Sequence, residues 1–259
     1  MLLSVGPLLL LLACLPSVVG FLPFGLDLLV AGVLLGLGGV LVLGILQGRR
    51  DYKQYCRVAA LQSDPTPANA AEAFQHINSP QAIVRTTAIE TVRAVCEYTP
   101  GKLTTRLGAR LDAEAISESL VQRLRDEETD VRWSAATIIK LLSRDYPSAF
   151  YPHAPRFSTL LEHPDSHVRI EMALTLGYLG SASTDTASSA AGALVPAVQD
   201  ADPDVRRAAT ASLGRLPCPR SITMLDHLTA DAMPAVQQDA QRALDSVRSR
   251  YPPADHVAR

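Results

Sequence analysis

The histidines and cysteines are the residues of this chain whose chemistry could support metal binding or nucleophilic catalysis. His163 and His167 are four residues apart, a spacing that puts two imidazoles on one helix face, where they could ligate a metal ion. Pro164 and Asp165 lie between them, and both residue types are typical of the turn before a helix. We therefore expect a polar loop here rather than a metal site.

The cysteines also lack the spacing that metal binding or redox exchange requires. No Cys-x-x-Cys pair occurs, and no recognisable base accompanies Cys96 in the sequence. We expect buried free thiols, which favour a reducing compartment. The four positions are Cys14, Cys56, Cys96 and Cys218.

Composition and charge argue against two further classes of function. The glycines of residues 36–39 lie within an apolar run, so they do not form a phosphate-binding loop. The net charge of −2 over 259 residues provides no basic field that would attract nucleic acid. We assign no catalytic, cofactor-binding or metal-binding residue, and we expect no cofactor and no nucleic-acid partner.

One helical pattern occurs five times between residues 84 and 247. Its apolar residues stand at offsets 0, 4, 8 and 11 from a leading valine, which at about 100° per residue is an arc of about 80°. Each copy should therefore bury a single stripe against a preceding helix. The valines are 47, 37, 37 and 31 residues apart, and a period one helix pair long indicates an α-solenoid. They are Val84, Val131, Val168, Val205 and Val236.

Each such helix needs a partner, and a suitable segment precedes every copy. Asp202-Pro203 and Asp165 are expected to start second helices as caps, and Gly180–Ser189 reads as a polar linker. Residues 249–259 read as a frayed tail. The expected first helices are Ala68–Ile77, Ala113–Arg125, Phe150–Leu161, Ala187–Val198 and Ile222–Leu228.

The stretch Asp202–Leu216 resembles the second helix of a HEAT repeat, in the short form shared with phycobilisome-lyase-like proteins. The resemblance covers about residues 65–248 and implies a fold of about five HEAT-like repeats. It also implies that the arginine after each valine bonds acidic groups between successive turns, with Asp130 and Asp204 among the partners. Ligand binding by aligned guanidiniums is the alternative. The arginines are Arg85, Arg132, Arg169 and Arg206.

Residues 1–48 are apolar enough to predict a transmembrane hairpin with spans at about 2–22 and 24–47. The second run has about 24 residues, which as a helix is roughly 36 Å long and long enough to cross a bilayer. A cleaved signal peptide over residues 1–20 is the alternative for the first run.

The segment 49–64 follows the second run and begins with cations and tyrosines. Cations just beyond a span mark the cytoplasmic side, and tyrosines suit the headgroup layer. We therefore expect a multi-pass protein of the cell membrane whose repeats, residues 65–248, are cytoplasmic. The expected interface residues are Arg49, Arg50, Tyr52, Lys53 and Tyr55.

Apolar residues on the outer face of the second helices suggest where a partner binds. Offsets 2, 6 and 9 lie opposite the buried stripe, yet Trp133, Ile170 and Leu174 occupy them in adjacent repeats. Arg93 and Lys140 are nearby at offset 9, and a tryptophan flanked by cations is typical of a protein-binding hot spot. Alternatively, the segment Phe150–Phe157 folds over these residues and buries them.

The sequence thus predicts an all-α protein: an α-solenoid of about five HEAT-like repeats preceded by two transmembrane helices. The expected function is a non-catalytic, membrane-anchored scaffold that binds a protein partner at the cytoplasmic face. Two alternatives stay open. One is an accessory subunit of a membrane complex assembled through the hairpin. The other, implied by the resemblance, is a lyase-like chromophore or cofactor attachment factor.

Overall fold

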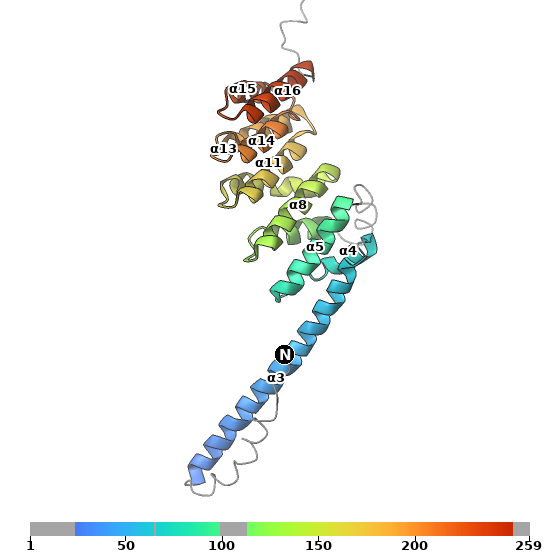
Figure 1. Ribbon diagram of the computed structural model, residues 1–259, viewed down its shortest axis with the longest axis vertical. Helices are drawn as coiled ribbons and strands as arrows, with labels where there is room; N and C mark the ends of the chain where they lie inside the picture. The colour runs from blue at the N-terminus through green and yellow to red at the C-terminus, as the bar shows by residue number, and fades with distance from the viewer. Residues whose placement is uncertain (1–23, 65, 99–112, 251–259) are drawn as a thin grey trace, which may run out of the picture. The chain divides into compact units, whose positions relative to one another are not determined.

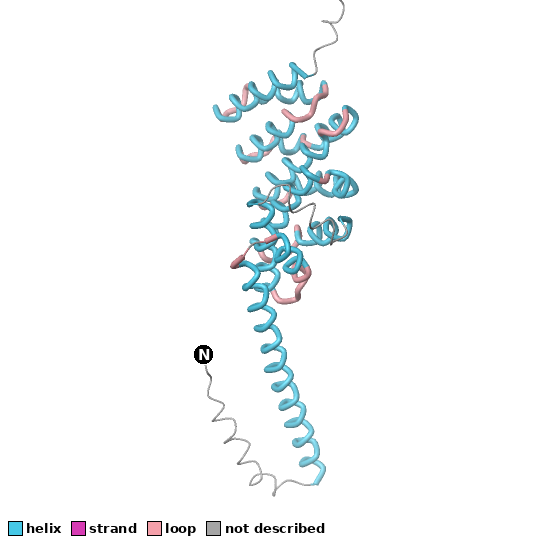
Figure 2. The backbone as a smooth tube through the Cα atoms, turned by 90° about the vertical axis from the view of Figure 1, so that its right-hand side faces the viewer, coloured by secondary structure: helices cyan, strands magenta, loops and turns pink. Residues whose placement is uncertain are grey.

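A computed structural model describes residues 24–64, 66–98 and 113–250 of the chain. These ranges form helices and their connecting loops and contain no strand (Figures 1 and 2), which confirms the expected all-helical class. The chain divides into two units, Met1–Gln54 and Tyr55–Arg259.

The first described element is α3, a single helix of 39 residues, Phe24–Gln62. It does not end near residue 47, where the second span was expected to end, because the following residues contain no proline or glycine after Gly48 and favour helix. The first expected span, residues 2–22, lies outside the described residues. Among the described residues, no helix combines the length and apolarity that crossing a bilayer requires.

The residues expected at a membrane interface all lie on α3. Arg49, Arg50, Tyr52 and Lys53 are exposed. Tyr55 differs, because it is half-buried and packs against the core of the second unit together with the last turns of α3. Val58 in those turns is completely buried.

The described residues of the second unit form five helix pairs stacked in chain order (Figure 1), which confirms the solenoid of helical repeats. Its second helices pack on one another as one layer: α5 on α8, α8 on α11, α11 on α14 and α14 on α16. The pairs are α4 (Pro67–Phe74) with α5 (Ala82–Tyr98); α7 (Ala113–Arg123) with α8 (Thr129–Asp145); α9 (Pro147–Phe150), η1 (Tyr151–His153), α10 (Ala154–Thr159) and η2 (Leu160–Glu162) with α11 (Ser166–Gly180); α12 (Thr184–Ala193) and α13 (Val195–Val198) with α14 (Pro203–Leu213); and α15 (Pro219–Leu228) with α16 (Pro234–Arg250).

The apolar pattern lies where the sequence places it. The four patterned positions of all five copies are buried, and the most exposed of them, Leu142, is only 9% accessible. The buried arc is wider than expected, however. In α8, Ser134, Ala136 and Ile138 are buried as well, because each inner second helix packs between two others in addition to its first helix.

The expected first helices differ in their boundaries from the structure, most of all around the third repeat. The segment Phe150–Leu161 is not one helix but a run of short α and 3₁₀ turns, because Pro152 and Pro155 lack the N–H groups that a continuous helix needs. The expected linker Gly180–Ser189 is partly helical, since α12 begins at Thr184. Ser183 and Thr186 exchange hydrogen bonds there as a capping box.

The predicted caps of the second helices are confirmed. The Asp202 side chain accepts a hydrogen bond from the backbone N–H of Asp204, and Pro203 occupies the first turn of α14. Asp165 likewise accepts from the N–H of His167 at the start of α11.

Gly177 lies where α11 closely approaches α14. A Cβ atom there would lie 2.6 Å from the Cβ of Ser212 and 2.8 Å from its Cα, so backbone would have to move. We expect Gly177→Ala to lower the free energy of unfolding by about 1–3 kcal/mol, measured by urea titration with circular dichroism. In Gly192→Ala, the added carbon meets only the end of the Arg220 side chain, so this control should be neutral or gain up to about 1 kcal/mol. Equal stability of both variants would contradict the close packing.

Candidate functional site

Arginine–aspartate pairs join successive repeats along the second-helix layer. Arg85 donates from Nε and Nη2 to both carboxylate oxygens of Asp126, at 3.0 and 2.9 Å. Its Nη1 donates to the carbonyls of Ser79 and Pro80 in its own loop. Arg169 and Asp200 repeat this arrangement at 2.7 and 3.0 Å, and Arg206 and Asp231 repeat it at 2.7 and 2.9 Å.

The aspartates of these pairs are not the ones expected. Each stands five residues before the leading valine of the next repeat, where it also accepts the backbone N–H two residues further on. Asp204 instead lies 3.6 Å from Arg207 at the surface. Asp130 is exposed and makes no ion pair with a described residue. Both stand in the first turn of their own helix, past the loop that faces the preceding repeat's arginine.

The paired aspartates are held ionised. Burial alone would raise the pKa of Asp200, but hydrogen bonds from Arg169 and the Asp202 N–H, with the attraction of Arg169 and Arg206, lower it below its usual value. The pKa of Asp126 is lowered against the same opposing effect of burial. For Asp231, the hydrogen bond from Arg206 is the main cause of the lowered pKa. These pairs are internal to the solenoid, as a structural role requires.

The series is interrupted between α8 and α11. His163 occupies the position of the missing aspartate, and its Nδ1 accepts the Asp165 N–H at 3.1 Å. Arg132 still donates Nη1 to the carbonyls of Asp126 and Glu127, but its Nε is buried without a hydrogen-bond partner among the described residues. The nearest carboxylate oxygen, on Asp165, is 3.9 Å from Nη2.

The carboxylate of Asp165 is hydrogen-bonded to Trp133 instead of to Arg132. The Nε1 of Trp133 donates to Oδ2 of Asp165 at 2.6 Å, and the ring centroid of Trp133 lies 5.1 Å from that of His167. Burial would raise the pKa of Asp165, but the hydrogen bonds from Trp133 and the His167 N–H lower it. The indole is therefore fixed at two points, while 41% of the residue stays exposed.

Trp133 lines a cleft of about 330 Å³ that residues of α5, α8 and α11 share. At its α11 side, Glu171 is almost fully buried and lies 2.9 Å from Nζ of Lys140. Thr137 donates to Glu171 at 3.1 Å. The lining residues are Glu90, Arg93, Glu97, Asp130, Trp133, Ser134, Thr137, Lys140, His167 and Glu171.

Three of the five residues expected to bind a partner line this cleft: Trp133, Arg93 and Lys140. Ile170 and Leu174 do not line it, because they are half-buried and pack against the core. Phe150 and Phe157 are themselves buried, and Trp133 stays 41% exposed, so this segment does not cover it.

Glu171 was not singled out from the sequence, although it is the most buried ionisable group of the cleft. A sequence signal existed, because the corresponding offset holds Thr87, Ser134 and Ala208 in the first, second and fourth copies, and only the terminal copy also has an acidic residue there, Asp239. A carboxylate among small neutral residues at a buried position marks a local departure from the repeat.

Among the described residues, we identify no catalytic arrangement of the remaining reactive side chains. Ser117 lies 3.1 Å from Nε2 of His153, but Ser117 is only 1% exposed, so a substrate cannot reach it. Burial, followed by the charges of Glu97 and Asp145, raises the pKa of the Cys96 thiol to about 12. Within the described ranges, no group of three histidine, cysteine or acidic residues could hold a metal ion.

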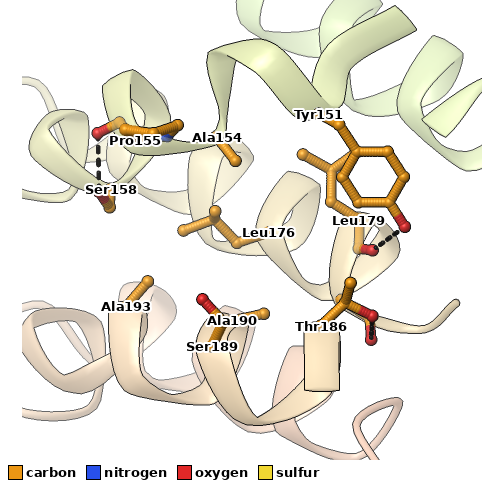
Figure 3. Close-up of a pocket in the computed structure, with 11 residues that line it drawn as sticks. Tyr151, Ala154, Pro155, Ser158, Leu176, Leu179, Thr186, Ser189, Ala190 and Ala193 are labelled. Atoms are coloured by element: carbon orange, nitrogen blue, oxygen red, sulfur yellow. Dashed lines mark hydrogen bonds between the residues drawn. The ribbon is translucent and has the colours of Figure 1, made fainter. Parts of the chain in front are cut away.

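A second cavity, of about 200 Å³, lies between the α10 region, α11 and α12 (Figure 3). Three of its four hydroxyl groups are bonded to backbone carbonyls: Tyr151 to Leu179 at 2.8 Å, Ser158 to Pro155 at 2.7 Å and Thr186 to Gly180 at 3.2 Å. Leucine and alanine side chains make up much of the remaining lining. We regard it as a packing seam between two first helices and assign no ligand to it.

Comparison with known proteins places the fold. Residues 155–245 match the family of HEAT repeats. An engineered protein with a crystal structure superposes with a TM-score of 0.58 at 18% identity, covering 75% of this chain and 88% of that one. A designed armadillo repeat protein in complex with the peptide (KR)4 gives 0.58 at 15% identity, covering 74% and 91%. No curated protein matches the sequence. At these identities the likeness is one of fold.

The interruption at His163 leads to a stability prediction. We expect His163→Asp to raise the free energy of unfolding by about 1 kcal/mol at neutral pH, because the carboxylate would pair with Arg132 as Asp200 pairs with Arg169. The unfolding midpoint in urea is the measurement. In the presence of Arg132→Lys the gain should disappear, since an ammonium lacks the guanidinium fork. If His163→Asp stabilises the protein equally in the Arg132→Lys background, pairing with Arg132 is not the cause of the added stability.

Proposed function

We propose that this protein is a non-catalytic scaffold whose repeat domain binds a protein partner through the Trp133 cleft. The observation that carries the proposal is the half-exposed indole of Trp133, fixed by Asp165 where the arginine–aspartate series is interrupted. Rigid, partly exposed aromatic side chains in a cleft are typical anchors of protein interfaces. The arginine–aspartate pair is missing between α8 and α11, and such a local break in a repeated pattern is typical of functional sites, which are often less stable than the rest of a fold.

Stacked helical repeats suit this role. They form an extended surface and hold side chains of successive repeats at fixed spacings. Computationally designed armadillo repeat proteins for modular peptide recognition have a similar fold, with a TM-score of 0.58 over 75% of this chain. This likeness supports binding of a peptide or protein in general, and the choice of surface rests on the cleft.

We also propose that the scaffold is anchored in the cell membrane with its repeats in the cytoplasm. The support is in the sequence: the apolar runs 2–22 and 24–47, and the cations Arg49, Arg50 and Lys53 that follow them. Anchoring predicts that the chain stays with the membrane pellet after alkaline extraction. Release into the supernatant would overturn this part of the proposal and leave the cleft unaffected.

Crosslinking and affinity capture from the native cells test the partner-binding role. We expect Trp133→Ala to lose the partner that the wild type captures, by about 30-fold or more in affinity, as for a central aromatic anchor. Gln238→Ala is the matched control, because Gln238 is the exposed residue at the same offset of the last repeat. Unchanged helicity and melting of both variants would show that folding is not the cause. Equal capture by both variants would overturn the proposal.

A further inference from the structure

We propose that the Trp133 cleft recognises an arginine side chain of the partner, an inference that rests on the proposed function. Two features of the cleft point to this ligand: its uncompensated charge and the partly exposed indole of Trp133.

The uncompensated charge of the cleft is negative. Its lining contains four carboxylates and two cations, which without counting His167 is a net charge of −2. Both cations are already paired: Arg93 with Glu97 at 3.0 and 3.2 Å, and Lys140 with Glu171. They are therefore not free to attract an anionic ligand.

Two carboxylates of the cleft lack a strong partner. Asp130 makes no ion pair with a described residue, and Glu90 receives one long hydrogen bond, 3.4 Å from Nε2 of Gln62. Asp130 stands three residues before Trp133 on α8, so both side chains lie on one helix face. Like charges that face a shared cleft repel each other, and a cationic ligand relieves that repulsion.

Glu171 adds a buried acceptor. Its side chain is 7% exposed, and its Oε1 accepts from Thr137 and Lys140 at 3.1 and 3.0 Å. Oε2 lies 2.9 Å from the same Nζ, yet this contact lacks hydrogen-bond geometry and Oε2 accepts no hydrogen bond from any described residue. The Lys140 ammonium contacts both oxygens and compensates the charge of Glu171, so the charge left for a cationic ligand is that of Asp130 and Glu90.

The indole favours arginine over lysine. A guanidinium is planar, stacks flat on an aromatic face and presents five donors in a fixed fork, whereas an ammonium is compact and more strongly hydrated. The hydrogen bond to Asp165 holds the indole in place, so stacking on it requires little ordering. An apolar side chain in the cleft would bury the carboxylates of Asp130 and Glu90 without compensation.

Fluorescence can test this directly, because Trp133 is the single tryptophan of the 259 residues. The probe is an acetylated decapeptide of alternating arginine and serine, titrated into the purified whole chain in detergent. The matched controls are the same peptide with citrulline, which keeps the shape and removes the charge, or with lysine. We expect saturable emission change with arginine, at least tenfold weaker binding with lysine and weaker still with citrulline.

A double variant supplies the second arm of the experiment. Asp130→Asn with Glu90→Gln should weaken binding of the arginine peptide by tenfold or more. Asp204→Asn, an exposed aspartate at the same register in another repeat, should leave it unchanged. Equal binding of the citrulline peptide, or no saturable change with the arginine peptide, would overturn the proposal. If capture of the native partner still required Trp133, the proposed function would stand without it.

Discussion

Asp200→Asn should lower the free energy of unfolding of the repeat domain by about 2–3 kcal/mol. The substitution keeps the shape of the side chain but removes the charge that two nitrogens of Arg169 contact at 2.7 and 3.0 Å. Both side chains are largely buried, at 9% and 15% exposure, and removal of one member of such a pair leaves the other without compensation. The loss falls at the boundary between two repeats, where a solenoid derives much of its cooperativity.

Urea unfolding followed by circular dichroism measures this loss, and Asp204→Asn is the matched control. Asp204 contacts Arg207 at 3.6 Å, with side chains 67% and 50% exposed, so its removal should change stability by less than about 0.5 kcal/mol. Equal effects of the two substitutions would show that the buried pair contributes no more than a surface contact.

The same pair predicts a dependence on pH. The pKa of Asp200 is lowered in the folded state, so its contribution is present above the unfolded value, near 4, and is lost as pH falls through the folded value. The pKa values of Asp126 and Asp231 are also lowered, and their contributions change in the same direction. Wild-type stability should therefore fall below about pH 4, and Asp200→Asn should show a shallower fall.

Phe157→Ala should be the most destabilising single core substitution in the irregular first-helix region of the third repeat, at about 3–5 kcal/mol. Phe157 is completely buried on α10, in a segment whose prolines interrupt the helix. With few continuous backbone hydrogen bonds to hold this segment, its attachment to α11 depends on the buried aromatic and leucine side chains.

Phe157→Leu separates packing from the loss of a ring. It retains most of the apolar volume and should cost no more than about 1.5 kcal/mol in the same urea titration. Tyr98→Ala is the surface control, since Tyr98 is 78% exposed and should be close to neutral. A small effect of Phe157→Ala would mean that the region collapses readily around the cavity.

The repeated elements were predictable from the sequence because their signals are local. Burial of the valine-led stripes follows from the spacing of apolar residues along one helix, and the caps at Asp165 and Asp202 follow from the residues next to them. The start of α12 also has a local signal, because Ser183 and Thr186 form a capping box, but the small, polar composition of this segment indicated a linker instead.

The partners across repeats were not predictable in this way. Asp200 is 31 residues from Arg169, and only the stacking of two repeats brings their side chains together. Glu171 and Lys140 are also 31 residues apart, so the sequence presented Lys140 as a free cation although its charge is paired. Local periodicity identifies which face a residue occupies, but charge compensation across that face depends on neighbouring helices.

Site-specific photocrosslinking tests the central claim, that the Trp133 cleft holds a protein partner. Benzoylphenylalanine at position 97 lies on the lining of the cleft, and at position 238 it lies on an exposed site of the last repeat. The account predicts a discrete protein adduct from position 97 that is lost with Trp133→Ala, and no such adduct from position 238. An adduct that persists with Trp133→Ala, or that forms equally from both positions, would contradict it.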